Sequence, residues 1–301
     1  MTLVAPEQVH RRKYGNGILR RFEKTPPSIV CPHFWQFNWG YGCAFNCSYC
    51  YLQGTLRGQK KPRHKKLSHI NVALENAFLD GKMGYLKPTI FNSGELTDSL
   101  AFPALMEKIA DKFETQNIHK LLLLTKSDDV GFLVKKPRHQ TIYSFSLNAT
   151  EVAKRWELGA ATPEERINAA KNVSEAGYEV RVRIDPIFPI NGWKQHYEDI
   201  LYSLLSSLDK DPNRITLGTP RGLQKTIRFS KDLSWTKYFS EKSSWGKKLS
   251  TESRKEIYQF ISDKLHSLGF DKSNVSICKE TEIMWKELGW NKDKCKCNCI
   301  W

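Results

Sequence analysis

Hydrophobic and polar positions follow two different periods along the chain from about residue 34 onward. Short runs of β-branched, aromatic and other apolar residues predict strands at residues 34–38, 88–93, 120–126, 141–148, 179–187 and 214–218. Amphipathic stretches with helical spacing lie between them. Because this alternation is typical of parallel βαβ units, the sequence predicts an α/β fold.

The clearest predicted helix lies at residues 162–176. It begins with a capping box formed by Thr162 and Glu165, with proline at the first helical position. Apolar residues then recur at helical spacing until Gly177 ends the run. We expect further helices at residues 101–115, 195–208 and 251–268.

Six strands with crossover helices fit either a partial, TIM-like (β/α)6 barrel or a doubly wound sheet, and spacing alone does not separate the two. We expect a basic N-terminal extension at residues 1–33, a core at 34–221 and a C-terminal extension at 222–301. This last segment should hold a long insertion or loop at 222–250, then a strand, a helix and a cysteine-rich tail.

The net charge of +15 narrows the choice of partners. A surface this basic usually faces phosphates or an acidic membrane, so a polyanion is favoured. The first residues contain no apolar stretch typical of a secretory signal, and no run of about 18 apolar residues occurs anywhere. We therefore predict a cytoplasmic protein with no membrane partner.

Eight cysteines in a reducing compartment indicate metal binding or catalysis rather than disulfides. Cys43, Cys47 and Cys50 follow a predicted strand at the spacing C-x-x-x-C-x-x-C. Three thiolates at this spacing can bind three irons of one [4Fe-4S] cluster and leave the fourth iron open for S-adenosylmethionine (SAM). The alternative is a structural zinc ion, which needs a fourth ligand nearby.

A second group of cysteines lies near the C-terminus, whereas Cys31 stands apart from both groups. Cys295, Cys297 and Cys299 end the chain, and Cys278 lies on the preceding predicted strand. Four thiolates suit a second iron-sulfur cluster or a zinc ion. The alternatives are low-pKa redox or hydrogen-donor thiols beside lysines, or incidental cysteines.

The residues around the first group resemble a known family. The stretch from Cys47 to Leu56, the Phe-Ser-Leu-Asn sequence ending at Asn148, and the Ile-Asp-Pro-Ile sequence at 184–187 resemble the spore photoproduct lyase-like, DNA repair photolyase-like group of the radical SAM superfamily. The resemblance implies the partial barrel, with its site at the carboxyl ends of the strands. It also implies a lyase-like radical SAM enzyme of DNA repair, with a flavodoxin, ferredoxin or reductase as electron donor.

The resemblance further suggests residues that bind SAM. Lys126 resembles a lysine near the SAM carboxylate, and Ser146 and Asn148 resemble polar SAM contacts. The alternative for each is a polar group that caps a helix at the end of a strand. Arg183 and Asp185 could form an ion pair at the rim of the barrel.

The chain departs from the lyase at one position that matters for the reaction. Glu95 stands where the lyase has a cysteine hydrogen donor, and Gly94-Glu95 resembles the element that binds the SAM amino group in many radical SAM enzymes. A carboxylate cannot donate a hydrogen atom as a thiol does. Tyr49 and Tyr51 still resemble the tyrosines of the lyase's hydrogen-transfer route.

A run of basic residues follows the first cysteine group, and we call it the basic strip. It contains Arg57, Lys60, Lys61, Arg63, Lys65 and Lys66, with no acidic residue among them. Phosphate contacts by such a strip supply salt-dependent affinity for nucleic acid, and DNA is the favoured partner. The alternative is a solvated loop.

These features support a radical SAM enzyme that acts on a nucleic acid base, by lesion reversal or base modification. A second hypothesis is radical modification of a peptide or a small molecule, with an auxiliary cluster in the tail. A third is an iron-sulfur or zinc module that binds nucleic acid without catalysis.

Overall fold

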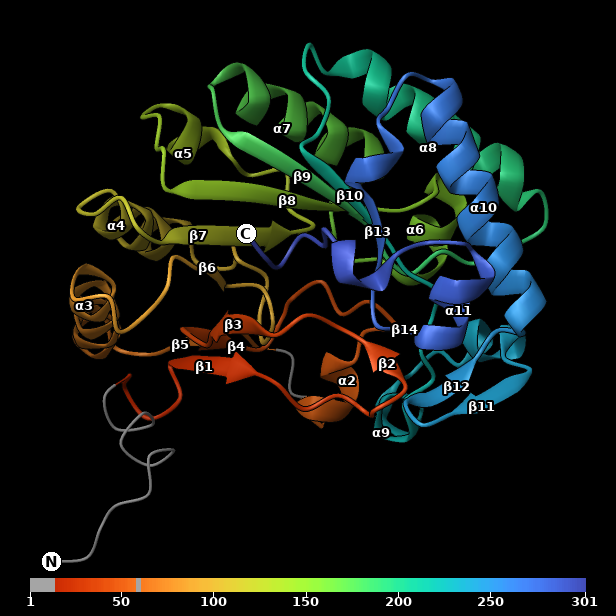
Figure 1. Ribbon diagram of the computed structural model, residues 1–301, viewed down its shortest axis with the longest axis horizontal. Helices are drawn as coiled ribbons and strands as arrows, with labels where there is room; N and C mark the ends of the chain where they lie inside the picture. The colour runs from red at the N-terminus through yellow and green to blue at the C-terminus, as the bar shows by residue number, and fades with distance from the viewer. Residues whose placement is uncertain (1–13, 58–60) are drawn as a thin grey trace, which may run out of the picture.

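The computed structural model describes residues 14–57 and 61–301 and is built around one eight-stranded sheet (Figure 1). The strand order is β1-β3-β6-β7-β8-β9-β10-β13, parallel throughout except that β1 pairs antiparallel with β3. The bounds are β1 Leu19–Phe22, β3 Phe34–Phe37, β6 Ile90–Asn92, β7 Lys120–Thr125, β8 Thr141–Leu147, β9 Glu179–Ile184, β10 Arg214–Leu217 and β13 Val275–Ile277. All six predicted strands are confirmed, and the α/β class with them.

Both outer strands come from the predicted extensions. β1 lies in the segment assigned to the N-terminal extension, and β13 lies in the C-terminal segment. β1 and β13 form the two edges of the sheet, which therefore stays open. Two short pairs accompany it, β2 (Ile29–Val30) with β14 (Glu280–Thr281) and β4 (Gly40–Tyr41) with β5 (Arg63–His64).

The longer helices lie on the outer side of this sheet (Figure 1). The α-helices are α2 Leu52–Thr55, α3 Leu67–Lys82, α4 Pro103–Phe113, α5 Gly131–Val134, α6 Thr150–Trp156, α7 Pro163–Glu175, α8 Trp193–Ser207, α9 Gln224–Phe229, α10 Thr251–Ser267 and α11 Glu282–Glu287. The capping box of α7 is present, with the Glu165 amide donating to Thr162 Oγ1 at 3.2 Å. None of the helices found in residues 14–57 and 61–301 could cross a membrane.

Residues 222–250 are more ordered than expected of a loop. They form α9, a 3-10 helix at Ser234–Tyr238, and a hairpin of β11 (Glu241–Ser243) with β12 (Gly246–Lys248). Trp235 is fully buried, and the Trp156 indole donates to Ser234 Oγ at 2.9 Å. The aromatic residues in this polar stretch thus anchor it to the core.

Along the central strands, alternate side chains face either the hydrophobic core or the opposite face of the sheet. On β8, Tyr143, Phe145 and Leu147 belong to the main hydrophobic core. The alternate side chains of Ser144 and Ser146 lie on the opposite face, because successive residues of a strand point to opposite sides. Polar side chains at the carboxyl ends of the strands are thereby turned toward one cavity.

Candidate active site

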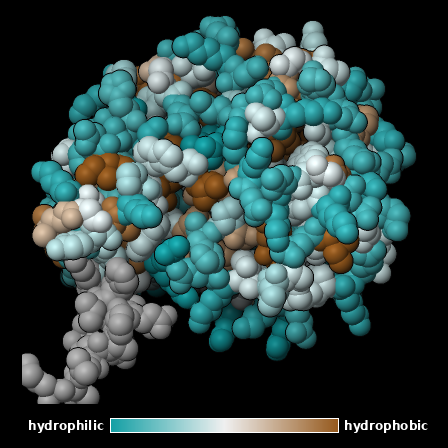
Figure 2. Space-filling model, in the orientation of Figure 1, coloured by the Kyte–Doolittle hydropathy of each residue, from teal (hydrophilic) through white to brown (hydrophobic). Residues whose placement is uncertain are grey.

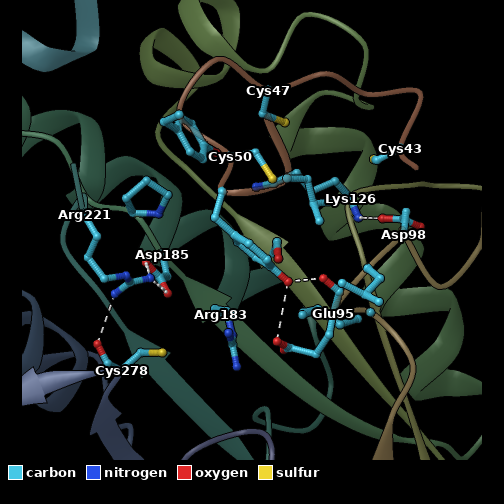
Figure 3. A pocket seen from close by; sticks show the side chains of 18 of the residues that line it. Cys43, Cys47, Cys50, Glu95, Asp98, Lys126, Arg183, Asp185, Arg221 and Cys278 are labelled. Atoms are coloured by element: carbon cyan, nitrogen blue, oxygen red, sulfur yellow. Dashed lines mark hydrogen bonds and ion pairs between the residues drawn. The ribbon is translucent and has the colours of Figure 1, made fainter. Parts of the chain in front are cut away.

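A cavity of about 330 Å³ lies at the carboxyl ends of the parallel strands (Figure 3). The residues predicted for the site that line it are Cys43, Cys47, Tyr49, Cys50, Tyr51, Gly94, Glu95, Lys126, Ser146 and Cys278. The volume is in the range of sites for small molecules and cofactors. The sheet therefore brings most of the predicted residues together, although they are spread over more than two hundred positions.

The cysteine loop runs from β4 to α2 and is held by side-chain and backbone hydrogen bonds. Gln53 Nε2 donates to Asn46 Oδ1 at 2.8 Å and to the Cys47 carbonyl at 3.2 Å. The Ser48 amide donates to the Trp156 carbonyl at 2.9 Å. Asn46 has the left-handed φ of 52° that turns the chain between the cysteines.

The three loop cysteines face the cavity from one end (Figure 3). Burial raises the pKa of Cys43 to about 12 and also raises the pKa values of Cys47 and Cys50. No three Cys, His, Asp or Glu side chains of the described chain stand at the spacing that suits a single metal ion. Three thiols without a fourth cysteine in the loop suit a cubane cluster bound at three corners, so the donor set fits that cofactor.

Gly94 and Glu95 form the wall beside the loop. A Cβ atom on Gly94 would lie 2.5 Å from Leu124 Cβ, so only glycine allows this close approach to β7. Asn92 holds the turn, since its Nδ2 donates to Glu95 Oε1 at 3.1 Å and its Oδ1 accepts from the Gly94 amide at 2.9 Å. Within residues 14–57 and 61–301, buried Glu95 forms no ion pair with lysine or arginine.

Glu157 connects several of the predicted residues, and the sequence analysis missed it. Its Oε1 accepts from Lys126 Nζ at 3.0 Å and from Asn148 Nδ2 at 3.1 Å, and the Tyr49 hydroxyl also donates to it. Its Oε2 lies 2.6 Å from Arg166 Nη2 in a fully buried ion pair. Burial alone would raise the pKa of Glu157, but the charges of Lys126 and Arg166 lower it to about 2.

The polar residues at the end of β8 have different surroundings. Ser146 lines the cavity, whereas Asn148 is fully buried and is not among the lining residues. Asn148 Nδ2 also donates to the Pro186 carbonyl at 3.0 Å, and its Oδ1 accepts from Tyr197 at 2.7 Å. The contact of Asn148 with SAM stays a prediction.

The two tyrosines point to different partners. Tyr49 packs on the Phe188 ring, with the centroids 5.6 Å apart, and reaches Glu157. Tyr51 lines the cavity and its hydroxyl donates to the Glu95 carbonyl. A role of either tyrosine in hydrogen transfer stays a prediction.

On the opposite wall, Arg183 and Asp185 do not form the suggested ion pair with each other. Asp185 pairs with Arg221, whose Nη2 lies 2.8 and 2.7 Å from the two carboxylate oxygens (Figure 3). Arg183 instead donates from Nη2 to Cys299 Sγ at 3.0 Å. Arg183 lies near the end of β9 and Asp185 just after it, and Arg221, from the segment after β10, binds both oxygens of the carboxylate.

The second cysteine group is brought close to this cavity. Cys278 follows β13 and lines the cavity wall. Cys297 and Cys299 are buried, and Cys295 is partly buried. Cys31, which the sequence analysis left apart, packs with the tail cysteines.

The basic strip lies beside the cysteine loop, as far as it is described; Lys60 falls outside the described residues. Arg63 on β5 pairs in register with Tyr41 on β4, at the start of the loop. Arg57, Lys61, Arg63 and Lys66 are exposed and Lys65 is partly buried. Figure 2 shows a largely hydrophilic surface on the face of the molecule drawn in Figure 1.

A largely parallel, open sheet with a three-cysteine loop at the carboxyl ends of its strands defines a protein of the radical SAM class. The sequence model of the spore photoproduct lyase family matches residues 21–220, well over half of the chain. The chain therefore belongs to the spore photoproduct lyase family, whose members are radical SAM enzymes that use a [4Fe-4S] cluster and SAM.

Relatives and solved structures agree with this assignment. The chain is 32% identical over 171 residues to a Clostridium acetobutylicum spore photoproduct lyase, covering 53% of this chain and 48% of that protein. It is 28% identical over 224 residues to the Bacillus subtilis protein, covering 68% and 62%. The chain thus spans between about half and three fifths of these relatives' lengths.

Solved structures of spore photoproduct lyase share the fold. One, complexed with dinucleoside spore photoproduct, has a TM-score of 0.69 at 21% identity and covers 85% of this chain and 78% of that chain. A variant with bound AdoMet, which is SAM, and the same dinucleoside has a TM-score of 0.68 at 21% identity over the same shares. This likeness confirms the predicted fold.

Proposed function

We propose that this chain is a radical SAM enzyme that acts on a nucleic acid base in the cytoplasm, with DNA lesion reversal as the specific reaction. One observation carries the proposal: the three thiols of the family's loop share a cavity with Glu95, Lys126 and Ser146. The basic strip supports nucleic acid as the substrate of this chain in particular. The relatives are spore photoproduct lyases, and one solved structure holds a dinucleoside spore photoproduct.

Cys43, Cys47 and Cys50 would bind the cluster, and the wall around them would bind SAM. With both bound, the cluster would supply the one electron that splits SAM into methionine and a 5′-deoxyadenosyl radical. Glu95 forms no salt bridge in the described chain and faces the cavity, so its carboxylate can accept the SAM ammonium group. A flavodoxin, ferredoxin or reductase would supply the electron.

Hydrogen bonds position Lys126 to bind an anionic group. Its amide donates to Asp98 Oδ2 at 2.9 Å, and its ammonium group donates to Glu157 Oε1 at 3.0 Å while keeping 15% of the side chain exposed to the cavity. A second anion, the SAM carboxylate, would add to this charge-assisted network. Glu157 is therefore a positioning residue for Lys126.

The basic strip would bind the phosphates of the substrate. Two of its exposed members, Lys61 and Arg63, lie beside Gly42 and Tyr41 at the start of the cysteine loop, so bound nucleic acid would run past the mouth of the cavity. A base inside a duplex would have to leave the stack to reach Tyr51.

The proposal is tested with the full chain reconstituted anaerobically with iron and sulfide. After reduction, we expect 5′-deoxyadenosine from SAM and the recovery of thymines from DNA that carries spore photoproduct. Radical formation without lesion repair would overturn lesion reversal and favour base modification, or a peptide or small-molecule substrate. No 5′-deoxyadenosine at all would favour the non-catalytic binding module.

Replacing Lys61, Arg63 and Lys66 with glutamine should weaken DNA binding and flatten its dependence on salt. Each phosphate contact contributes about −0.9 to the slope of log affinity against log salt in B-DNA, so three lost contacts should reduce the slope by about 2 to 3. The measurement is fluorescence anisotropy across a salt series. Lys210→Gln is the control, because this exposed lysine lies before the amino end of β10. An unchanged slope in the triple variant would exclude the strip as the contact surface.

A further inference from the structure

The C-terminal tail enters the inner side of the sheet and is locked there by hydrogen bonds. Asn298 is fully buried, and its Nδ2 donates to Ser144 Oγ and to the Val182 carbonyl, both at 2.9 Å. Thr216 Oγ1 donates to Asn298 Oδ1 at 2.7 Å. Figure 1 shows the C-terminus lying over the central strands. The cysteines on either side of Asn298 are thus held at fixed places inside the barrel.

Four cysteines from three distant segments line one small cavity next to the proposed SAM site. Cys31 follows β2, Cys278 follows β13, and Cys297 and Cys299 come from the tail. This cavity shares Glu95, Arg183, Cys278 and Lys279 with the larger one. The four thiols therefore surround a space separated from the SAM cavity by a wall of shared side chains.

Cys295 lies outside this set, although its position in the tail motif suggests otherwise. Its sulfur lies 3.0 Å from Ser276 Oγ, and it does not line the cavity of the four thiols. Cys295 does pack against Cys297 and Cys299 from outside this cavity. Among the residues that line this cavity, Cys31 therefore stands where the predicted second group has Cys295.

Two donors, buried Asn92 and partly buried Arg183, point at one sulfur of the set. Arg183 Nη2 donates to Cys299 Sγ at 3.0 Å, and Asn92 Nδ2 donates to the same sulfur at 3.4 Å. Arg183 Nε is buried and has no hydrogen-bond partner. A neutral thiol is a weak acceptor, whereas donors directed at a sulfur are typical of metal-bound thiolates and tune their metal. The partly buried Arg183 guanidinium would also offset part of the negative charge of four thiolates.

We propose that Cys31, Cys278, Cys297 and Cys299 bind one metal centre as four thiolates, and that Cys295 is not a ligand. Zinc and an iron-sulfur cluster both accept such a set. Like the first cysteine group, these thiols are not spaced for a single ion in the described chain, so metal binding draws them together and releases their protons. The proposal rests on these residues and is independent of the proposed reaction.

The test uses a full chain in which Cys43, Cys47 and Cys50 are replaced with alanine, so that bound metal reports the second site alone. After loading with zinc, or anaerobically with iron and sulfide, we expect about one zinc, or about four irons with as much labile sulfide, per chain. Elemental analysis distinguishes the two. No metal in this background would overturn the proposal, whatever SAM chemistry the unmutated chain performs.

The ligand set is tested by two matched variants in the same background. Cys31→Ala should lose at least about tenfold in metal affinity, whereas Cys295→Ala should bind metal as the parent does. The reverse result would overturn the assignment of Cys31. Circular dichroism checks folding, and the thiolate charge-transfer bands of the cobalt-loaded parent count the sulfur ligands without relying on a variant. Bands of fewer than four thiolates would also contradict the proposal.

Discussion

Replacing Glu157 with glutamine should lower the free energy of unfolding by about 3–5 kcal/mol, because it leaves a buried charge without its partner. The Arg166 guanidinium lies 2.6 Å from this carboxylate, and both side chains are fully buried. Lys126 loses its carboxylate partner as well. Urea unfolding followed by circular dichroism measures the change.

The matched control for Glu157→Gln is Glu151→Gln, in the first turn of α6. Glu151 forms an i,i+3 pair with Lys154 at 3.3 Å, and the Lys154 and Glu151 side chains are 68% and 37% exposed. Such pairs contribute little, so Glu151→Gln should change the stability by no more than about 0.5 kcal/mol. Equal, small losses in the two variants would show that the Glu157 ion pair does not stabilise the fold.

The difference in stability between the unmutated chain and Glu157→Gln should depend on pH, because folding lowers the pKa of Glu157. The pKa of Glu157 falls from 4.5 to about 2 in the folded chain. A carboxyl group with a lowered pKa stabilises the fold fully above its unfolded value and loses that contribution as pH falls through its folded value. The stability advantage of the unmutated chain over Glu157→Gln should therefore shrink between about pH 4.5 and about pH 2. A constant difference across this range would contradict the charge pairing.

Much of the fold was predictable because the strands bury one face or both. The alternation on β8 separates core residues such as Phe145 from cavity residues such as Ser146, and that period is visible in the sequence. The order of the strands and the antiparallel β1 were not predictable, because pairing depends on contacts far apart in sequence. The helix and hairpin within 222–250 were not predicted because its polar residues hide the few aromatic anchors, such as Trp235, that order it.

The candidate site was likewise predictable from the sequence only in part. The cysteine loop was predictable because its ligands lie within eight positions, and their spacing itself carries the chemistry. Glu157 and Cys31 belong to no motif, and each meets its partners only after folding. A signal did exist for Glu157, since a carboxylate just after α6 faces the two cations Lys126 and Arg166, but only the structure shows that all three are adjacent.

Replacing Cys47 with alanine should reduce SAM cleavage to the level of the metal-free protein, the largest effect on activity expected of any single change. The cluster would keep only two of its three protein ligands, and thiolate ligation is what holds such a cluster in place. The reconstituted variant should lose about four irons per chain relative to the unmutated protein. The measurement pairs iron analysis with 5′-deoxyadenosine formation.

Cys295→Ala is the control for Cys47→Ala, because it removes a cysteine that lies outside both proposed ligand sets. It should keep the SAM cleavage and the iron of the unmutated chain. Cys47 is 5% exposed and its carbonyl accepts from Gln53; since alanine keeps that backbone contact, an unchanged circular dichroism spectrum would separate ligand loss from unfolding. A Cys47→Ala protein that still cleaves SAM would exclude this loop as the site of the catalytic cluster, and a loss of all metal would show that the two centres assemble together.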